Sequence, residues 1–183
     1  MQWLLFLPQL PASPSTLRVM VWRKMRAAGA LGLQNGVWVL PQTSDQKELT
    51  EELSDYIQEH GAHSYIFDVS SFNQAIEKDV LEQFRADRDE EYSEFCERCE
   101  ALLEEVERET SQEKFTFAEL EETEEDLQKL ENWLGKINTR DFFHSQKRKA
   151  ADELFGLCQA AHQEFANKVY ASQGMEIPGD PEQ

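Results

Sequence analysis

The sequence predicts an α+β protein in which a small mixed domain is followed by an acidic helical domain. In residues 1–71, short apolar runs bounded by proline, glycine or Asn-Gly alternate with segments of helical pattern. From residue 72 onward, apolar residues recur every three or four positions, as on one face of a helix. With 183 residues, 40% of them apolar, the chain can bury a core in one or two small domains.

The first domain begins with an expected strand and helix. Residues 2–7, QWLLFL, are apolar on both alternating faces, as in a central strand. Ser13 and Pro14 form an N-cap followed by a proline at the first helical position, so a helix is predicted from there to Ala28. Gly29 is the expected C-terminal cap of that helix.

A tight hairpin is predicted next, because Asn35-Gly36 lies between two apolar runs and both central residues of a type I′ turn need positive φ. In that register Leu33 faces Trp38 and Leu31 faces Leu40. Four side chains would then point toward the helices: Leu31, Leu33, Trp38 and Leu40. Val37 and Val39 would point to the other face of the sheet.

A second helix is predicted over residues 45–60, after a Ser44 cap and before Gly61. Residues 62–69, AHSYIFDV, are predicted to be the last strand. The element order is then β-α-β-β-α-β, the arrangement of a ferredoxin-like domain, over residues 1–71.

Residues 72–172 are predicted to form an antiparallel helical hairpin or a three-helix bundle. Breaks at residues 110–114 and 139–145 separate three apolar stripes. The clearest members of these stripes are Ile76, Val80, Phe84, Phe95, Leu102 and Val106, then Leu120, Leu127, Leu130, Leu134 and Ile137, then Leu154, Cys158, Ala161, Phe165 and Val169. Residues 173–183 are expected to be a flexible tail.

The charge is distributed unevenly along the chain. The formal net charge is −18, yet residues 1–44 contain four basic residues and no acidic one. Binding of nucleic acid over the whole surface is therefore not expected, and only the first 44 residues offer a basic face. No run approaches the roughly 20 apolar residues of a membrane span. Three cysteines are too few for a disulfide framework, and a cytoplasmic location is expected.

Two long segments resemble a known family. WLLFLPQLPASPSTLRVMVWRKMRAAGALGLQNGVWVLP resembles the start of the ChrB chromate-resistance regulators, and FTFAELEETEEDLQKLENWLGKINTRDFF resembles their helical segment. The likeness covers residues 2–171. It implies a cytoplasmic bacterial protein that binds DNA and regulates a chromate-efflux operon, with chromate or another oxyanion as a further partner.

The hairpin region also resembles the ferredoxin-like domain of PaaX-type repressors and of small CRISPR-associated nucleases. ChrB proteins usually continue into a second, C-terminal domain, whereas this sequence ends at residue 183. If that domain holds the chromate sensor, sensing is not expected from this chain alone.

The candidate site for DNA or an oxyanion lies on the first helix. Arg18, Trp22 and Arg26 recur at i, i+4 and i+8 and so share one face, with Arg23 and Lys24 beside it. Guanidinium groups near an indole can bind a phosphate or a tetrahedral oxyanion. The alternative is structural: Trp22 is partly core, and the arginines stack on it or pair with acidic helices.

Two further clusters are candidates. Lys147, Arg148 and Lys149 begin a predicted helix, where an anion can bind, although acidic residues are preferred there. A zinc site would use Cys96, Cys99, Cys158 and His162, because each pair falls on one helix face. The alternative is that Cys99 and Cys158 are small core residues and that His162 is at the surface. We expect the chain to bind neither a metal ion nor a cofactor.

Enzymatic motifs are not found in the sequence. It has no Gly-rich phosphate loop, HExxH or GxSxG, and a nuclease of the CRISPR-associated type would need an acidic residue after the first strand, where this chain reads LPQLP. A non-enzymatic DNA-binding regulator is therefore predicted. The alternative is a protein-interaction or oligomerisation module.

A homodimer is expected because one face of the predicted sheet needs a cover. Val37 and Val39 point away from the two helices, and soluble monomers rarely keep a large apolar patch exposed. Either the helices after residue 72 fold over this face or a second copy packs there. The second copy is favoured, with Val37 and Val39 in the interface.

Overall fold

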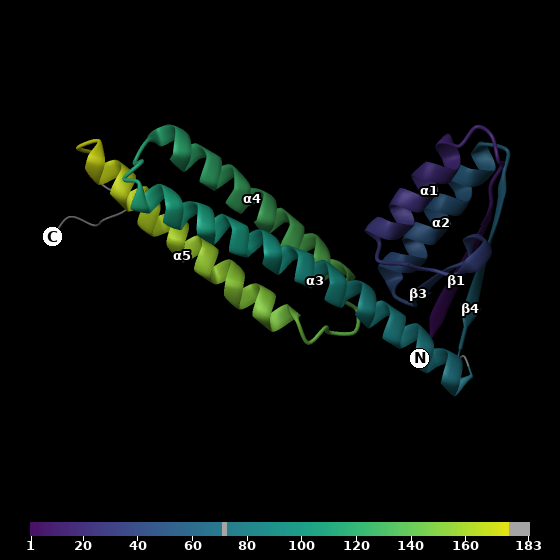
Figure 1. Ribbon diagram of the computed structural model, residues 1–183. Helices are drawn as coiled ribbons and strands as arrows, with labels where there is room; N and C mark the ends of the chain where they lie inside the picture. Colours follow the sequence, from purple (N-terminus) through teal and green to yellow (C-terminus); the bar gives the residue numbers. More distant parts are fainter. Residues whose placement is uncertain (71–72, 176–183) are drawn as a thin grey trace. The chain divides into compact units, whose positions relative to one another are not determined.

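The computed structural model describes residues 1–70 and 73–175 (Figure 1). The contacts group the chain into two compact units. The first comprises Met1–Asp87 and Arg140–Phe143, and the second comprises Arg88–Thr139 and the residues from His144 onward. The first unit thus extends beyond residue 71, where the sequence suggested a boundary, and includes the beginning of the third helix.

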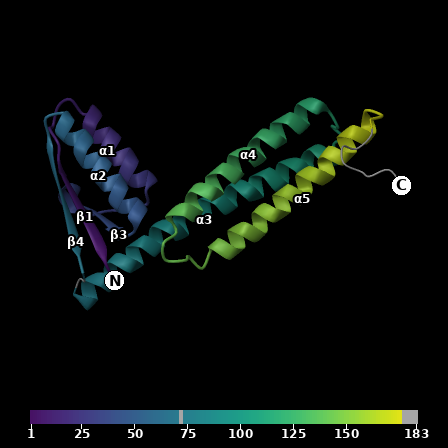
Figure 2. The ribbon, with the colours of Figure 1, turned by 180° about the vertical axis from the view of Figure 1, so that it is seen from behind.

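The first unit contains a four-stranded antiparallel sheet with two helices on one face (Figures 1 and 2). The strands occur in the order β2-β3-β1-β4 across the sheet, so β2 and β4 are its edges. Its elements are β1 (Trp3–Gln9), α1 (Thr16–Ala27), β2 (Leu31–Gly32), a 3-10 turn η1 (Gln34–Gly36), β3 (Trp38–Pro41), α2 (Ser44–Glu59) and β4 (His63–Val69).

The two covering helices form in the predicted segments, but the predicted start of α1 is wrong: the helix begins at Thr16 after Ser15, and Ser13 and Pro14 lie before it. In α1, Leu17, Val21 and Met25 recur every four residues and are buried against the sheet. In α2 the N-cap is Thr43, whose hydroxyl accepts a hydrogen bond from the Gln46 amide at 3.3 Å, one residue earlier than expected.

The predicted hairpin register is wrong by one residue. The structure pairs Leu31 with Val39 and Gly32 with Trp38, because the loop contains the 3-10 turn and closes with a hydrogen bond from Leu33 N to Val37 O at 2.7 Å. A one-residue shift moves the side chains of one strand to the opposite face. Leu31 therefore shares the second face with Val39, and Leu33 is exposed. Trp38 and Leu40 do face α1 and α2.

The second face of the sheet is covered in part by the chain itself. Helix α3 (Gln74–Ser111) packs Val80 and Phe84 against Trp3, Leu31 and Val39. Glu77 of α3 also accepts hydrogen bonds from the Met1 amino group at 3.1 Å and from the Trp3 indole at 3.2 Å.

The proposed role of Val39 in a dimer interface must therefore be corrected. Its side chain is fully buried within the first unit because α3 folds over this part of the sheet. Val37, nearer the hairpin loop, is only half-buried. This part of the sheet could have been covered by a helix of the same chain or by a second copy, and the structure shows the helix.

The second unit is a bundle built from α3, α4 (Phe117–Arg140) and α5 (Arg148–Ser172) (Figures 1 and 2). The predicted stripes from Phe95 onward contribute to its core, which is centred on the fully buried Tyr92, Phe95, Cys99, Ile137, Phe165 and Val169. The earlier part of the first stripe differs from the prediction, because Ile76 is exposed and Val80 and Phe84 belong to the first unit. Within the described part of the chain, no helix is long and apolar enough to cross a membrane. Most of the predicted tail, residues 176–183, lies outside the described residues.

Candidate functional site

Helix α1 carries the basic residues singled out in the sequence. One side of the helix is buried through Leu17, Val21 and Met25. The rest of its circumference is accessible, and α1 contains no acidic residue. Every basic side chain of this helix therefore lies outside the core, which leaves the question of which of them are neutralised by partners.

Two of the four cations are engaged within the first unit. The Arg18 guanidinium donates a hydrogen bond to the Pro11 carbonyl at 2.9 Å, which ties the helix start to the preceding loop. Arg26 pairs with Asp87 at 3.4 Å, and both side chains are partly exposed. The structural alternative, in which the arginines pair with acidic helices, thus describes Arg26, whereas Arg18 is held by a loop carbonyl. Each keeps guanidinium nitrogens beyond these contacts.

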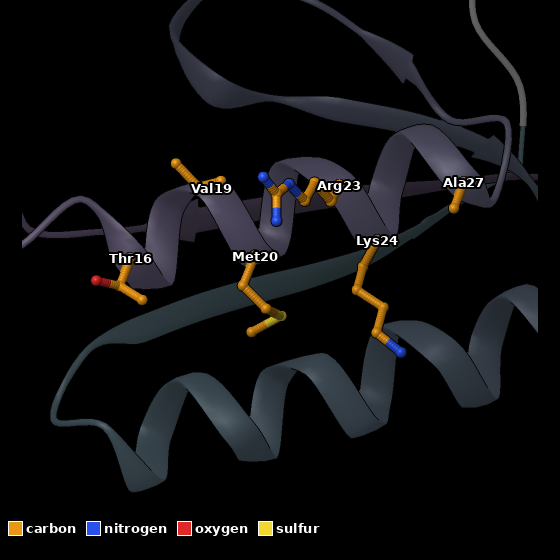
Figure 3. Close-up of a pocket in the computed structure, with 6 residues that line it drawn as sticks. All are labelled: Thr16, Val19, Met20, Arg23, Lys24 and Ala27. Carbon is orange, nitrogen blue, oxygen red and sulfur yellow. The ribbon is translucent and has the colours of Figure 1, made fainter.

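Arg23 and Lys24 are different, since neither forms an ion pair or a side-chain hydrogen bond with any described residue. They line an open groove of about 600 Å³ on the outside of α1. Its other lining residues are Thr16, Val19, Met20 and Ala27. Figure 3 shows that Met20 and Lys24 point toward α2, whereas Val19 and Arg23 project from the other side of α1. The groove therefore combines an apolar floor with two cations.

Trp22 lies on the face between Arg18 and Arg26 and is 53% exposed. About half of its surface is therefore covered and about half is accessible, and it is not among the buried residues of the core. An exposed indole is a flat apolar surface on which a base or an apolar group can stack. The five predicted residues thus remain on one helix, with a tryptophan and two unpaired cations available to an anionic partner.

All three residues of the second basic cluster have partners within the helical bundle, and two of these partners are acidic. Arg148 lies 3.8 Å from Asp152, and Lys149 lies 3.4 Å from Glu153, each one turn along α5. The Lys147 ammonium donates a hydrogen bond to the Ser93 hydroxyl. This cluster is therefore a weaker candidate for an anion site than α1.

The four candidate zinc ligands do not form a site. Cys99 and Cys158 are buried in the bundle core, where the Cys158 thiol lies 3.5 Å from the Cys99 carbonyl. His162 instead makes a hydrogen bond with Thr123 at 3.3 Å. No group of three or more His, Cys, Asp or Glu side chains among the described residues could hold a metal ion.

The pKa shifts of two of these thiols agree with their packing in the helical bundle. Hydrogen bonding with Cys158 and burial both raise the pKa of the Cys99 thiol. Burial and the charge of Glu100 raise the pKa of Cys96. Both shifts favour the protonated thiol, the form expected for cysteines packed in a core.

Strand β4 carries a surface feature that was not predicted from the sequence. Tyr65 and Phe67 are each 50% exposed, and their rings stack with centroids 6.4 Å apart. They lie on the same face as Leu5 and Leu7 of β1, beyond the part covered by α3. The alternation of His63, Tyr65 and Phe67 along this strand was the signal that could have revealed an unburied apolar stripe.

These features define an acidic α+β protein with a basic, tryptophan-bearing helix on its N-terminal unit and a long helical bundle. The chain belongs to the ChrB family: the model described as "Protein ChrB, N-terminal" matches residues 18–176. No curated protein matches the sequence significantly. The likeness to PaaX-type repressors and to CRISPR-associated nucleases stays a prediction.

Proposed function

We propose that this chain is a non-enzymatic, DNA-binding regulator of chromate resistance that acts on a chromate-efflux operon in the bacterial cytoplasm. Membership of the ChrB family supports the association with chromate resistance. The observation that supports DNA as the partner is helix α1, where Trp22 is exposed and Arg23 and Lys24 lack ion pairs with described residues. We also assign the first unit to the ferredoxin-like arrangement, on the basis of its element order and its strand order β2-β3-β1-β4.

The charge distribution favours α1 over other surfaces as the DNA contact. The chain carries 36 acidic and 18 basic residues, so most of its surface repels phosphate. Helix α1 is free of acidic residues and presents two guanidinium or ammonium groups that a phosphate can approach. Arg23 can bind a phosphate in a bidentate geometry, and Trp22 can pack against sugar or base edges.

Fluorescence anisotropy tests this proposal. Labelled duplexes that tile the DNA upstream of the chain's own gene are titrated with the protein at several salt concentrations. We expect binding that weakens as salt rises. In Arg23→Ala/Lys24→Ala the affinity falls, and the slope of log K against log salt becomes shallower by about 2, close to one unit for each lost phosphate contact.

The matched control is Lys136→Ala/Lys149→Ala, which removes the same charge from the helical bundle. Circular dichroism checks that both variants are folded. The proposal fails if the wild type binds none of the duplexes, or if the two double variants lose affinity equally. Adding chromate, with sulfate as the comparison, tests whether a tetrahedral oxyanion competes for the same face, as the partner implied by the family resemblance would.

A protein-interaction or oligomerisation module is the second candidate function. The stacked, half-exposed Tyr65 and Phe67 favour it, because such a patch on a soluble protein often marks a contact with another chain. Absence of DNA binding together with self-association would favour this candidate.

A further inference from the structure

Strand β4 is an unprotected edge of the sheet. It pairs with β1 at seven consecutive positions, from His63 opposite Gln9 to Val69 opposite Trp3. The sheet order places no described strand on its other side. Soluble proteins usually protect such edges with lysine, proline, a bulge or a very short strand. The sequence of β4, HSYIFDV, has neither lysine nor proline, and its pairing has no bulge.

The exposed side chains of β4 are complementary to themselves. If two copies of β4 pair antiparallel about a two-fold axis through Ile66, Tyr65 of each copy lies opposite Phe67 of the other. The four rings then form one aromatic row on the sheet face where each pair already stacks, with centroids 6.4 Å apart. Cross-strand aromatic pairs of this kind stabilise antiparallel sheets.

The polar residues of the strand agree with the same register. Ser64 would lie opposite Asp68 of the second copy, so that a neutral polar side chain faces the carboxylate; within one chain the Ser64 hydroxyl donates to the Ser54 hydroxyl at 2.8 Å. The two Asp68 side chains would not face each other. Within one chain Asp68 already accepts a hydrogen bond from Gln42 at 2.9 Å and lies 3.9 Å from the Lys47 ammonium, so its charge is partly compensated.

Charge also points to this strand as the place where two copies can meet. The net charge of −18 makes most contacts between two copies repulsive. Residues 63–67 carry no acidic or basic side chain apart from one histidine. The exposed halves of four rings supply about 300–500 Å² of buried area, and the paired backbones must supply most of the rest. The rings alone fall short of the roughly 1,200 Å² at the lower end of standard interfaces, so we expect a weak dimer that forms in the micromolar range.

We propose that β4 is a homodimer interface, through which two copies join their sheets by antiparallel β4–β4 pairing centred on Ile66. This places the contact at the sheet edge, away from Val39, which α3 covers. The inference does not depend on DNA binding, because it rests on the exposure and register of β4 alone.

Analytical ultracentrifugation tests the interface. The wild type is expected to pass from monomer to dimer across the micromolar range. Phe67→Glu places two acidic groups beside the aromatic row and should raise the dimer Kd by about 30-fold or more, as loss of an interface hot spot does. Tyr65→Thr/Phe67→Thr removes the rings but keeps strand-forming residues, so it should weaken the dimer without unfolding the chain.

The control for charge is Leu157→Glu, at a position of α5 that is 59% exposed. It should dimerise like the wild type. A wild type that stays monomeric throughout the micromolar range overturns the proposal, as does a Phe67→Glu variant that dimerises normally. If Leu157→Glu loses the dimer to the same extent as Phe67→Glu, the contact lies on the helical bundle, and the proposal is also overturned.

Disulfide trapping tests the register. With the two-fold axis at Ile66, Tyr65→Cys/Phe67→Cys brings residue 65 of one copy opposite residue 67 of the other, and mild oxidation should give a covalent dimer on a non-reducing gel. In the single variant Tyr65→Cys, the new cysteine faces Phe67 of the other copy, so much less covalent dimer should form. The wild type, oxidised in parallel, controls for Cys96, Cys99 and Cys158. Equal cross-linking in the single and double variants would contradict this register.

Discussion

His162 is the residue whose protonation the fold opposes most clearly. Its Nδ1 atom lies 3.3 Å from the Thr123 hydroxyl, which itself donates to the Leu120 carbonyl at 3.0 Å. The hydroxyl proton is thus already used, and Nδ1 must be the donor to Thr123. Burial lowers the pKa of His162, and the charge of Glu124 opposes this effect only in part. The neutral imidazole is therefore the form that the folded bundle favours.

We predict that the helical unit loses stability as the pH falls below 6.5. A lowered pKa in the folded state means that the unfolded chain binds the proton more readily, so the stabilisation is complete above the unfolded pKa and is lost as the pH decreases. Urea unfolding at pH 7 and pH 5, followed by circular dichroism, measures the change.

His162→Gln provides the control, because its amide can still donate to Thr123 but does not titrate. The variant should show a smaller loss between pH 7 and pH 5 than the wild type. Glu109 and Glu164 also have lowered pKa values, from hydrogen bonds with Lys114 and Lys168 respectively, but their effect falls at pH values near and below 4.5. Equal losses in the wild type and His162→Gln would contradict a role for His162.

At the scale of single elements, two helices end in the same way but in different surroundings. Gly29 follows α1 and Gly61 follows α2, and each has a φ of +74°. A Cβ atom at Gly29 would lie 2.8 Å from the Arg140 Cβ, whereas a Cβ at Gly61 would meet nothing within 4 Å. The backbone conformation is therefore equally unfavourable for alanine at both sites, and only Gly29 is also crowded.

We predict that Gly61→Ala lowers the free energy of unfolding by about 1–2 kcal/mol, the cost of a left-handed conformation for a residue with a side chain. Gly29→Ala should cost more, because Arg140 must also move. Chemical denaturation of the two variants measures the difference. A Gly29→Ala variant as stable as Gly61→Ala would show that the Arg140 segment adapts without cost.

Across the whole molecule, α3 is the element that belongs to both compact units. Its first part completes the core on the second face of the sheet. Phe84 is almost fully buried there, with ring centroids 6.0 Å from Trp3 and 5.3 Å from Phe143. Residues far apart in the sequence are thus required to close the first unit, and residues 1–71 alone would leave part of this face exposed.

We predict that Phe84→Ala destabilises the first unit by about 3–5 kcal/mol, the usual cost of removing a buried aromatic ring. Ile76→Ala, at an exposed position of the same helix, should change stability by less than about 0.5 kcal/mol. Thermal unfolding followed by near-ultraviolet circular dichroism reports on the aromatic packing. Similar effects of the two substitutions would contradict the assignment of Phe84 to this core.

The sequence by itself determined the features that depend on local spacing and capping. Leu17, Val21 and Met25 recur at helical intervals, so the buried side of α1 could be predicted, and with it the accessible basic side. The three long helices followed from their apolar stripes in the same way. The family could also be predicted, because the resemblance covers most of the chain.

Only the tertiary structure decided the features that depend on distant partners. Asp87 neutralises Arg26 from 61 residues away, so the difference between Arg26 and the unpaired Arg23 has no local signal. The 3-10 turn shifted the hairpin register, because a short loop can close in more than one way and the packing of Leu31 and Val39 under α3 favours one of them. Whether Tyr65 and Phe67 are buried depends on where α3 lies. The alternation of a strand shows that its two faces differ, but the rest of the fold decides which face is covered.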